Sequence, residues 1–166
     1  EKEYKSNDSG NFFEKHRFKK DRPVLILLPG SRQQEIDHHW PIFLDTISEL
    51  NKKFPGLQSV VIKSSHVKLV PMPEHIKIEH SSESAMQNGT AAICSSGTAT
   101  LECALANLPT VVCYKMSYLN WVLFNLLGKV KYISIVNLIA KKKIIPELIQ
   151  HKMTPENIIK KIIPYL

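Results

Sequence analysis

Residues 24–30 read Val24-Leu25-Ile26-Leu27-Leu28-Pro29-Gly30, a continuous apolar run that ends in a turn. Apolarity that does not alternate is typical of a strand buried on both faces, as in a parallel sheet. Short runs of the same kind recur at residues 60–62, 91–94 and 110–114, with a weaker one at 76–78. We therefore predict a parallel sheet built from these segments.

Helical periodicity fills the gaps between these runs. The first apolar stripe consists of Trp40, Phe43, Leu44, Ile47 and Leu50, and it ends at Pro55-Gly56. The second consists of Leu101, Ala104, Leu105 and Leu108, and Thr154-Pro155 predicts the start of a third helix. Strands that alternate with helices predict an α/β fold with a Rossmann-like, doubly wound parallel sheet. Such a sheet binds ligands at the carboxyl ends of its strands, near the point where the strand order reverses.

Length and composition are those of an ordinary globular protein. The 166 residues suffice for one domain, and 43% apolar with 22% charged residues exclude a largely disordered chain. No apolar stretch reaches the roughly 18 residues of a transmembrane helix. Three Cys without a C-x-x-C pair argue against a disulfide framework and favour reduced core thiols. The net charge of +7 favours an anionic partner: phosphate, nucleic acid or an acidic membrane surface.

The first 22 residues differ in character from the rest of the chain. They are polar and charged, and they lack a starting Met and the apolar core of a signal peptide. We predict a linker over residues 1–22, at the boundary of a segment cut from a longer protein, and one folded domain over residues 23–166.

The first strand end that can carry chemistry is the turn after residue 28. Gly30 removes a side chain where a ligand can approach the backbone, and Ser31 follows it. Arg32 then offers a planar fork of donors for a phosphate or a carboxylate. A tight turn with a solvated Arg32 is an equally good interpretation of these residues alone.

The second strand end runs into a loop of small residues that opens a helix. Free backbone N–H groups and the helix dipole make such a loop an anion site, and Ser96, Gly97 and Thr98 are small enough to let a diphosphate come close. Glu102 lies one turn further, where its carboxylate can accept two hydrogen bonds from a ribose diol. The alternative is a helix capped by Ser or Thr, with Glu102 as a partner of the helix dipole.

Four further features invite a functional or a structural interpretation. Asn137 interrupts an apolar run, and its amide suits a nucleobase edge, a phosphate or a satisfied buried position. Glu35, His38 and His39 have the spacing of no standard metal site, and we expect His39 on a helix surface. We expect the apolar residues 118–127 in the core or a domain interface. The basic run 141–143 is expected in a solvated loop, with anionic lipid as the alternative partner.

Together these segments resemble the lipid-A-disaccharide synthase family, which consists of inverting glycosyltransferases with the two-domain GT-B fold. The resemblance rests on five motifs in the family's order and spacing: Leu27-Leu28-Pro29-Gly30-Ser31-Arg32 with Glu35-Ile36, Ser96-Gly97-Thr98-Ala99-Thr100-Leu101-Glu102, and residues 109–115, 134–140 and 145–150. It implies that residues 23–166 form the Rossmann-like, nucleotide-sugar-binding half of such an enzyme. The N-terminal acceptor domain, which supplies the general base, would lie outside this chain.

The resemblance also implies a reaction and a set of binding residues. The family transfers 2,3-diacylglucosamine from UDP to 2,3-diacylglucosamine 1-phosphate and so forms a β-1,6-linked lipid A disaccharide. The implied UDP-binding residues are Gly30, Ser31, Arg32, Ser96, Gly97, Thr98, Glu102 and Asn137. Among them, Arg32 would hold the diphosphate, Glu102 the ribose, and Asn137 a phosphate or the uracil. No catalytic residue, metal or cofactor is expected in this chain, which should be inactive by itself.

The expected partners are UDP-2,3-diacylglucosamine and UDP, with the lipid acceptor bound through the absent domain. The resemblance implies a cytoplasmic bacterial protein, and it is compatible with a homodimer and with a peripheral contact on the inner face of the inner membrane. One alternative is another GT-B UDP-sugar transferase or epimerase, which should lack the segment around Asn137. The other is a basic, non-enzymatic nucleic-acid-binding domain, which should show aromatics among Lys and Arg. That pattern is not apparent, so we expect no nucleic-acid partner.

Overall fold

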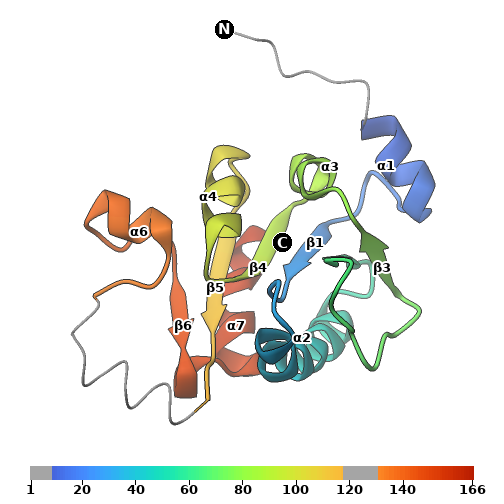
Figure 1. Cartoon of the computed structure of the whole chain (residues 1–166). Coiled ribbons are helices and arrows are strands. Elements are labelled where there is room, and N and C mark those ends of the chain that lie inside the picture. Colours follow the sequence, from blue (N-terminus) through green and yellow to red (C-terminus); the bar gives the residue numbers. More distant parts are fainter. Residues whose placement is uncertain (1–8, 118–130) are drawn as a thin grey trace, which may run out of the picture.

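The computed structural model describes residues 9–117 and 131–166 (Figure 1). The elements are α1 (Ser9–His16), β1 (Val24–Leu28), α2 (Gln33–Lys53), β2 (Gln58–Ile62), β3 (Ile76–Glu79), α3 (Ser82–Asn88), β4 (Ala91–Ser95), α4 (Thr98–Leu105), β5 (Thr110–Tyr114), α6 (Ile135–Ala140), β6 (Glu147–Ile149) and α7 (Pro155–Ile162), with short 3₁₀ turns at Gln150–Lys152 and Ile163–Tyr165. Helices separate the six strands of the described residues, except that β3 follows β2 without a helix between them.

The strands form one sheet in the order β3-β2-β1-β4-β5-β6. Every pairing in it is parallel. The chain proceeds outward from β1 through β2 to β3, and then returns to the other side of β1 to form β4. The strand order therefore reverses between β1 and β4, as in a Rossmann fold. This arrangement confirms the predicted doubly wound α/β fold.

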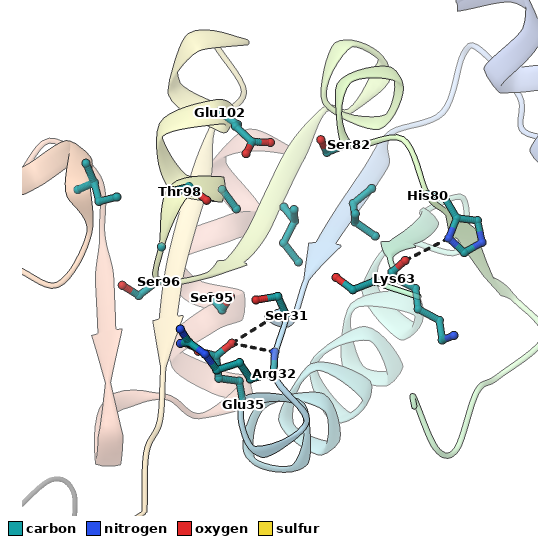
Figure 2. A pocket seen from close by; sticks show the side chains of 17 residues that line it. Ser31, Arg32, Glu35, Lys63, His80, Ser82, Ser95, Ser96, Thr98 and Glu102 are labelled. Carbon is teal, nitrogen blue, oxygen red and sulfur yellow. Dashed lines mark hydrogen bonds and ion pairs between the residues drawn. The ribbon is translucent and has the colours of Figure 1, made fainter. Parts of the chain in front are cut away.

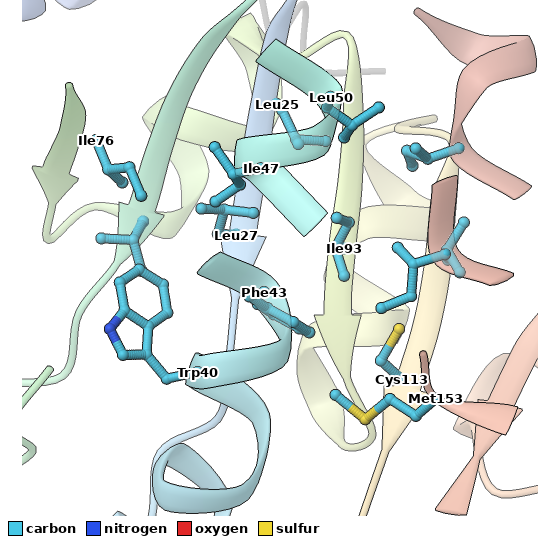
Figure 3. Close-up of a cluster of buried hydrophobic side chains, with 14 of the residues drawn as sticks. Leu25, Leu27, Trp40, Phe43, Ile47, Leu50, Ile76, Ile93, Cys113 and Met153 are labelled. Atoms are coloured by element: carbon cyan, nitrogen blue, oxygen red, sulfur yellow. The ribbon is translucent and has the colours of Figure 1, made fainter. Parts of the chain in front are cut away.

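Strand β1 contributes to both faces of the sheet, as its continuous apolarity predicts. Leu25 and Leu27 belong to the core cluster under α2 and α7, which also holds Trp40 and Phe43 (Figure 3). The alternate residues of β1 belong to a second cluster, which includes Phe12 of α1, Met86 of α3 and Cys103 of α4. Helices therefore cover the sheet on both sides, as burial of a parallel sheet requires.

The predicted helices are present, but α4 turns a different face to the core. Thr100 and Cys103 are its buried residues. Leu105, which the apolar stripe places inside, is 77% exposed, and Leu101 is 36% exposed. The periodicity of a helix of eight residues leaves its rotation open, and contact with the sheet selects the face that carries the smaller side chains Thr100 and Cys103.

The segment 1–22 holds more structure than a linker. Residues 9–16 form α1, and its Phe12 is 1% exposed in the cluster beneath α3. Phe12 packs edge-on against Phe13 and Phe18. The apolar face of α1 is hard to recognise in the sequence, because six of the eight residues of this helix are polar or Gly. The packed unit thus begins before residue 23.

A buried carboxylate attaches α1 to the carboxyl end of β3. Glu79 is 2% exposed. It accepts hydrogen bonds from Lys15 Nζ at 2.8 and 2.9 Å and from His16 Nε2 at 2.9 Å. The backbone amides of His80 and Ser81 donate to it at 2.7 and 3.1 Å. Burial by itself raises the pKa of this carboxyl, but the hydrogen bonds outweigh that effect and lower the pKa to about 2.

Three further expectations concern membrane spans, cysteines and the apolar segment 118–127. Among the described residues, no helix has both the length and the apolarity needed to cross a bilayer. Cys94, Cys103 and Cys113 are buried free thiols, as predicted. The segment 118–127 lies outside the described residues.

The depressed pKa of Glu79 predicts how stability responds to acid. A carboxyl whose pKa is about 2 in the folded protein, against an ordinary value of 4.5, stabilises the fold above the ordinary value. This stabilisation is lost as the pH falls from the ordinary value towards 2. We expect Glu79→Gln to lower the free energy of unfolding at pH 7, and the difference from the unmodified protein to shrink between pH 4.5 and 2. Urea unfolding across this pH range measures both quantities.

A matched control is Glu49→Gln. Glu49 pairs with Lys52 on the surface of α2, and both side chains are about half exposed or more. Surface ion pairs contribute roughly 0–1 kcal/mol, so this variant should change stability little at any of these pH values. A Glu79→Gln difference that does not vary with pH would contradict the ionised, hydrogen-bonded state of Glu79.

Candidate functional site

A cavity of about 570 Å³ opens at the carboxyl ends of the strands, between β1 and β4 (Figure 2). This is the point where the strand order reverses. Parallel pairing aligns Leu28 with Cys94, so the loops that follow β1 and β4 face each other. Seven of the predicted site residues line the cavity: Gly30, Ser31, Arg32, Ser96, Gly97, Thr98 and Glu102.

The first turn of α4 provides an open anion site on this cavity. Gly97 is the N-cap, with φ of +133°, and no side chain of the described residues caps the helix there. A Cβ at Gly97 would meet nothing within 4 Å, so the space beside it is empty. The N–H groups of a helix's first turn have no intrahelical acceptor, and the dipole there is positive. The loop can therefore receive an anion.

The start of α2 is different, because one of the protein's own carboxylates occupies the loop just before it. Glu35 Oε2 accepts hydrogen bonds from the backbone amides of Ser31 and Arg32 at 3.2 and 3.4 Å. A Cβ at Gly30 would lie 2.5 Å from that same oxygen. Gly30 thus makes room for the Glu35 carboxylate, and the contact with a ligand that its place after the strand predicts stays a prediction.

Arg32 is the exposed charged donor of the site. Its side chain is 79% exposed and contacts Glu35 Oε1 at 3.2 Å. Surface ion pairs at this spacing are weak. The guanidinium can therefore turn from Glu35 to a more highly charged anion, and its fork of donors suits a phosphate. Figure 2 shows Arg32 and Glu35 at one end of the cavity and Glu102 at the other, with Thr98 between them.

The cavity also extends to the ends of β2 and β3, which the sequence analysis does not assign to the site. Lys63 and Ser64 follow β2, and His80 and Ser82 follow β3. The His80 ring donates from Nδ1 to the Lys63 carbonyl at 3.1 Å and so ties the two strand ends together. β3 has the weakest apolar run of the six strands, so the sequence gives little indication that the polar residues after it belong to the site. The carboxyl ends of parallel strands lie at one edge of the sheet, and this rule does predict that the residues after β2 and β3 reach the site.

Asn137 is the one predicted site residue that does not line the cavity. It is fully buried, and its side chain makes four hydrogen bonds. Nδ2 donates to the Ile145 carbonyl at 2.9 Å and to Glu147 Oε1 at 2.8 Å. Oδ1 accepts from the amides of Ile144 and Ile145 at 2.7 and 3.0 Å. Both donors and both acceptor positions of the side-chain amide are therefore satisfied inside the protein. This agrees with the interpretation of Asn137 as a satisfied buried residue.

His39 is buried, and not on a helix surface as predicted. Nδ1 lies 2.8 Å from the Pro29 carbonyl, which can only accept, so Nδ1 donates. The Lys115 amide donates to Nε2 at 3.0 Å. Burial lowers the pKa of His39 more than its hydrogen bonds to the backbone raise it, so the neutral ring is favoured. The ring thereby joins the loop after β1 to the loop after β5.

Comparison with known proteins agrees with the geometry. The chain matches the sequence model of the family described as Lipid-A-disaccharide synthetase over residues 1–166. It is 35% identical over 153 residues to the lipid-A-disaccharide synthase of Solibacter usitatus (strain Ellin6076), which covers 89% of this chain and 40% of that protein. It is 37% identical over 139 residues to lipid-A-disaccharide synthase 1 of Legionella pneumophila (strain Paris), covering 79% of this chain and 36% of that protein. The chain thus spans about two fifths of the length of these relatives.

The fold also has a match among solved structures. The Escherichia coli ADP-heptose lps heptosyltransferase II superposes with a TM-score of 0.62 at 11% sequence identity, over 96% of this chain and 51% of that one. This likeness concerns the fold alone, and it agrees with the predicted Rossmann-like, doubly wound α/β sheet. The family match over the whole chain, together with the relatives above 30% identity, shows that this chain belongs to the lipid-A-disaccharide synthase family.

Proposed function

We propose that this chain is the nucleotide-sugar-binding part of a lipid-A-disaccharide synthase and that its cavity holds the UDP moiety of UDP-2,3-diacylglucosamine. The observation that carries the proposal is the open first turn of α4 at the point where the strand order reverses. Glu102 lies one helical turn beyond Thr98 and lines the same cavity. A diphosphate on the Thr98 turn would therefore place its ribose near a carboxylate that accepts hydrogen bonds.

The arrangement supports electrostatic stabilisation of a leaving group. Negative charge grows on UDP as the glycosidic bond breaks, and the amides of the α4 turn would face that charge if the diphosphate binds there. Arg32 adds a charged donor from the opposite loop. We propose that the acceptor is 2,3-diacylglucosamine 1-phosphate, that the transfer inverts the anomeric centre, and that the base which activates the acceptor hydroxyl lies outside these 166 residues.

We assign Asn137 a supporting role in this proposal. Its hydrogen bonds join α6 to the strand β6, and Glu147 of that strand also accepts from the Ser134 hydroxyl at 2.7 Å. Ile133, which precedes α6, accepts at its carbonyl from the Ser96 hydroxyl at 3.0 Å. The network therefore fixes the segment before α6, to which Ser96 of the α4 loop is hydrogen-bonded.

Glu102→Gln separates the ribose role from a role in helix stability. Gln keeps the shape but removes the charge and one acceptor, and hydrogen bonds to a charged acceptor contribute roughly 1.5–3 kcal/mol. UDP affinity should fall about tenfold or more. Pyrophosphate, which has no ribose, should bind no worse, because a nearby negative charge has been removed. Isothermal titration of both ligands against both proteins measures the contrast.

A helix-dipole role for Glu102 would give a different pattern. The unfolding free energy would change by roughly 0.3–1 kcal/mol, and the affinities for UDP and pyrophosphate would change in parallel. Parallel responses would therefore refute the ribose contact.

Asn137→Asp tests the supporting role. Asp loses both amide donors and sets a carboxylate beside Glu147, so we expect a loss of stability of at least about 1–3 kcal/mol. UDP affinity, measured at a temperature where the variant is folded, should change less than about threefold. Thermal unfolding and titration of the same preparation give the two values. A normal melting temperature with a large loss of UDP affinity would instead mean that Asn137 contacts the nucleotide.

The chain alone should bind UDP and form no disaccharide. General base catalysis needs a base within hydrogen-bond reach of the acceptor hydroxyl, and we place that base outside these residues. Mass spectrometry of a reaction with both lipid substrates would detect the product, with a full-length lipid-A-disaccharide synthase as the positive control. Disaccharide formed by the 166 residues alone would overturn this assignment.

A further inference from the structure

One wall of the cavity is formed by the loop that follows β3. His80 and Ser82 of this loop line the cavity. Ser82 lies across from Glu102, at the end of the cavity where the ribose is proposed (Figure 2). A nucleoside bound beside Glu102 would therefore be bounded by this loop, and its affinity would depend on how firmly the loop is held.

The loop is held by the buried carboxylate of Glu79. Its Oε1 accepts hydrogen bonds from the backbone amides of His80 at 2.7 Å and Ser81 at 3.1 Å. The Lys63 amide donates to the Glu79 carbonyl at 3.1 Å, and the His80 ring donates to the Lys63 carbonyl at 3.1 Å. The ends of β2 and β3 thus form one hydrogen-bonded unit on this side of the cavity.

Helix α1 supplies the side chains that face this carboxylate. Lys15 Nζ donates to both carboxylate oxygens, at 2.8 and 2.9 Å, and His16 Nε2 donates to Oε2 at 2.9 Å. A buried carboxylate without a charged partner is strongly unfavourable. Burial by itself raises the pKa of Glu79, but the hydrogen bonds lower it to about 2, so the carboxylate is ionised at neutral pH. Lys15 therefore stabilises the form of Glu79 that binds the loop amides.

Helix α1 also packs against the element that follows the loop. Phe12 belongs to the core cluster that contains Ala85 and Met86 of α3, and α3 begins at the last residue of the loop, Ser82. The loop is consequently fixed at one end through Glu79 and at the other through α3. A wall that is already ordered loses less conformational entropy when a ligand binds to it.

We propose that Lys15 and His16 are positioning residues of the nucleotide site, which act through Glu79 on the loop after β3. The inference rests on the proposed nucleotide site and extends it to α1. The three side chains are not among those that line the cavity, so their effect on a ligand is indirect. Helix α1 thereby has a role in binding besides its contribution to stability, because it keeps the loop in the arrangement that receives the nucleoside.

Lys15→Met tests this role with UDP and pyrophosphate as probes. The Lys15 side chain is 51% exposed, so its replacement leaves the core intact. If the competent arrangement of the loop falls to about one fifth of the population, the apparent affinity for UDP falls about fivefold. Pyrophosphate has no nucleoside and would bind at the α4 turn, so its affinity should change less than about twofold. Isothermal titration of both probes gives the ratio.

Two matched variants accompany this measurement. Lys15→Arg keeps the charge and the donors, so it should retain the affinity for UDP. Lys20→Met removes the same charge from an exposed turn just after α1, and it should leave both affinities unchanged. Hydrogen exchange provides a second readout, because the amides of His80 and Ser81 should exchange faster in Lys15→Met and at the normal rate in the other two variants.

A purely structural role of Lys15 would give a different result. The melting temperature of Lys15→Met would fall while UDP affinity stayed unchanged at a temperature where the variant is folded, and this outcome would overturn the positioning role alone. A parallel loss of UDP and pyrophosphate affinity, an equal loss in Lys15→Arg, or unchanged exchange of the two amides would overturn it as well. Failure of the unmodified protein to bind UDP would overturn the proposed nucleotide site and the positioning role with it.

Discussion

The parallel pairing of β1 with β4 is the constraint on which the rest of the molecule depends. The chain reaches β4 only after it has built β2 and β3 on the other side of β1. The loops after β1 and β4 are consequently followed by helices that leave the sheet on opposite faces. The described residues leave a cavity of about 570 Å³ between these loops. The cavity is thus a result of topology, and the residues of the two loops determine what it can bind.

The two helices that start at this point show how similar sequences acquire different roles. Both starts carry a glycine with positive φ, Gly30 at +124° and Gly97 at +133°. Beside Gly30 the Glu35 carboxylate takes the backbone amides, which satisfies the helix start from within. Beside Gly97 there is open space. An anion therefore has backbone donors available at α4, whereas in the loop before α2 the Ser31 and Arg32 amides already donate to Glu35.

The sequence predicts the strands well because a buried parallel strand needs an apolar run and little else. Strand β1 spans Val24–Leu28 and β5 spans Thr110–Tyr114, as predicted. Features that depend on a partner far along the chain are harder to predict. Helix α1 is attached to the rest of the protein through Glu79, which is 63 residues from His16. His39 and Asn137 are polar residues whose burial depends on backbone groups brought to them by the fold, and periodicity cannot show those groups. Seven of the eight predicted site residues gather because strand ends are readable from the sequence.

The buried polar residues have a common structural role, which explains why their side chains do not take part in the proposed ligand binding. Glu79 binds the amides that follow β3, and His39 binds the backbone that follows β1 and β5. Asn137 binds the amides that precede β6. In each case a side chain satisfies backbone groups that a strand end would otherwise leave unpaired, and it does so beside or behind a cavity wall. The walls are thereby held by groups that need no ligand. This leaves Arg32, Lys63 and Glu102, which line the cavity between β1 and β4, to interact with a ligand that enters it.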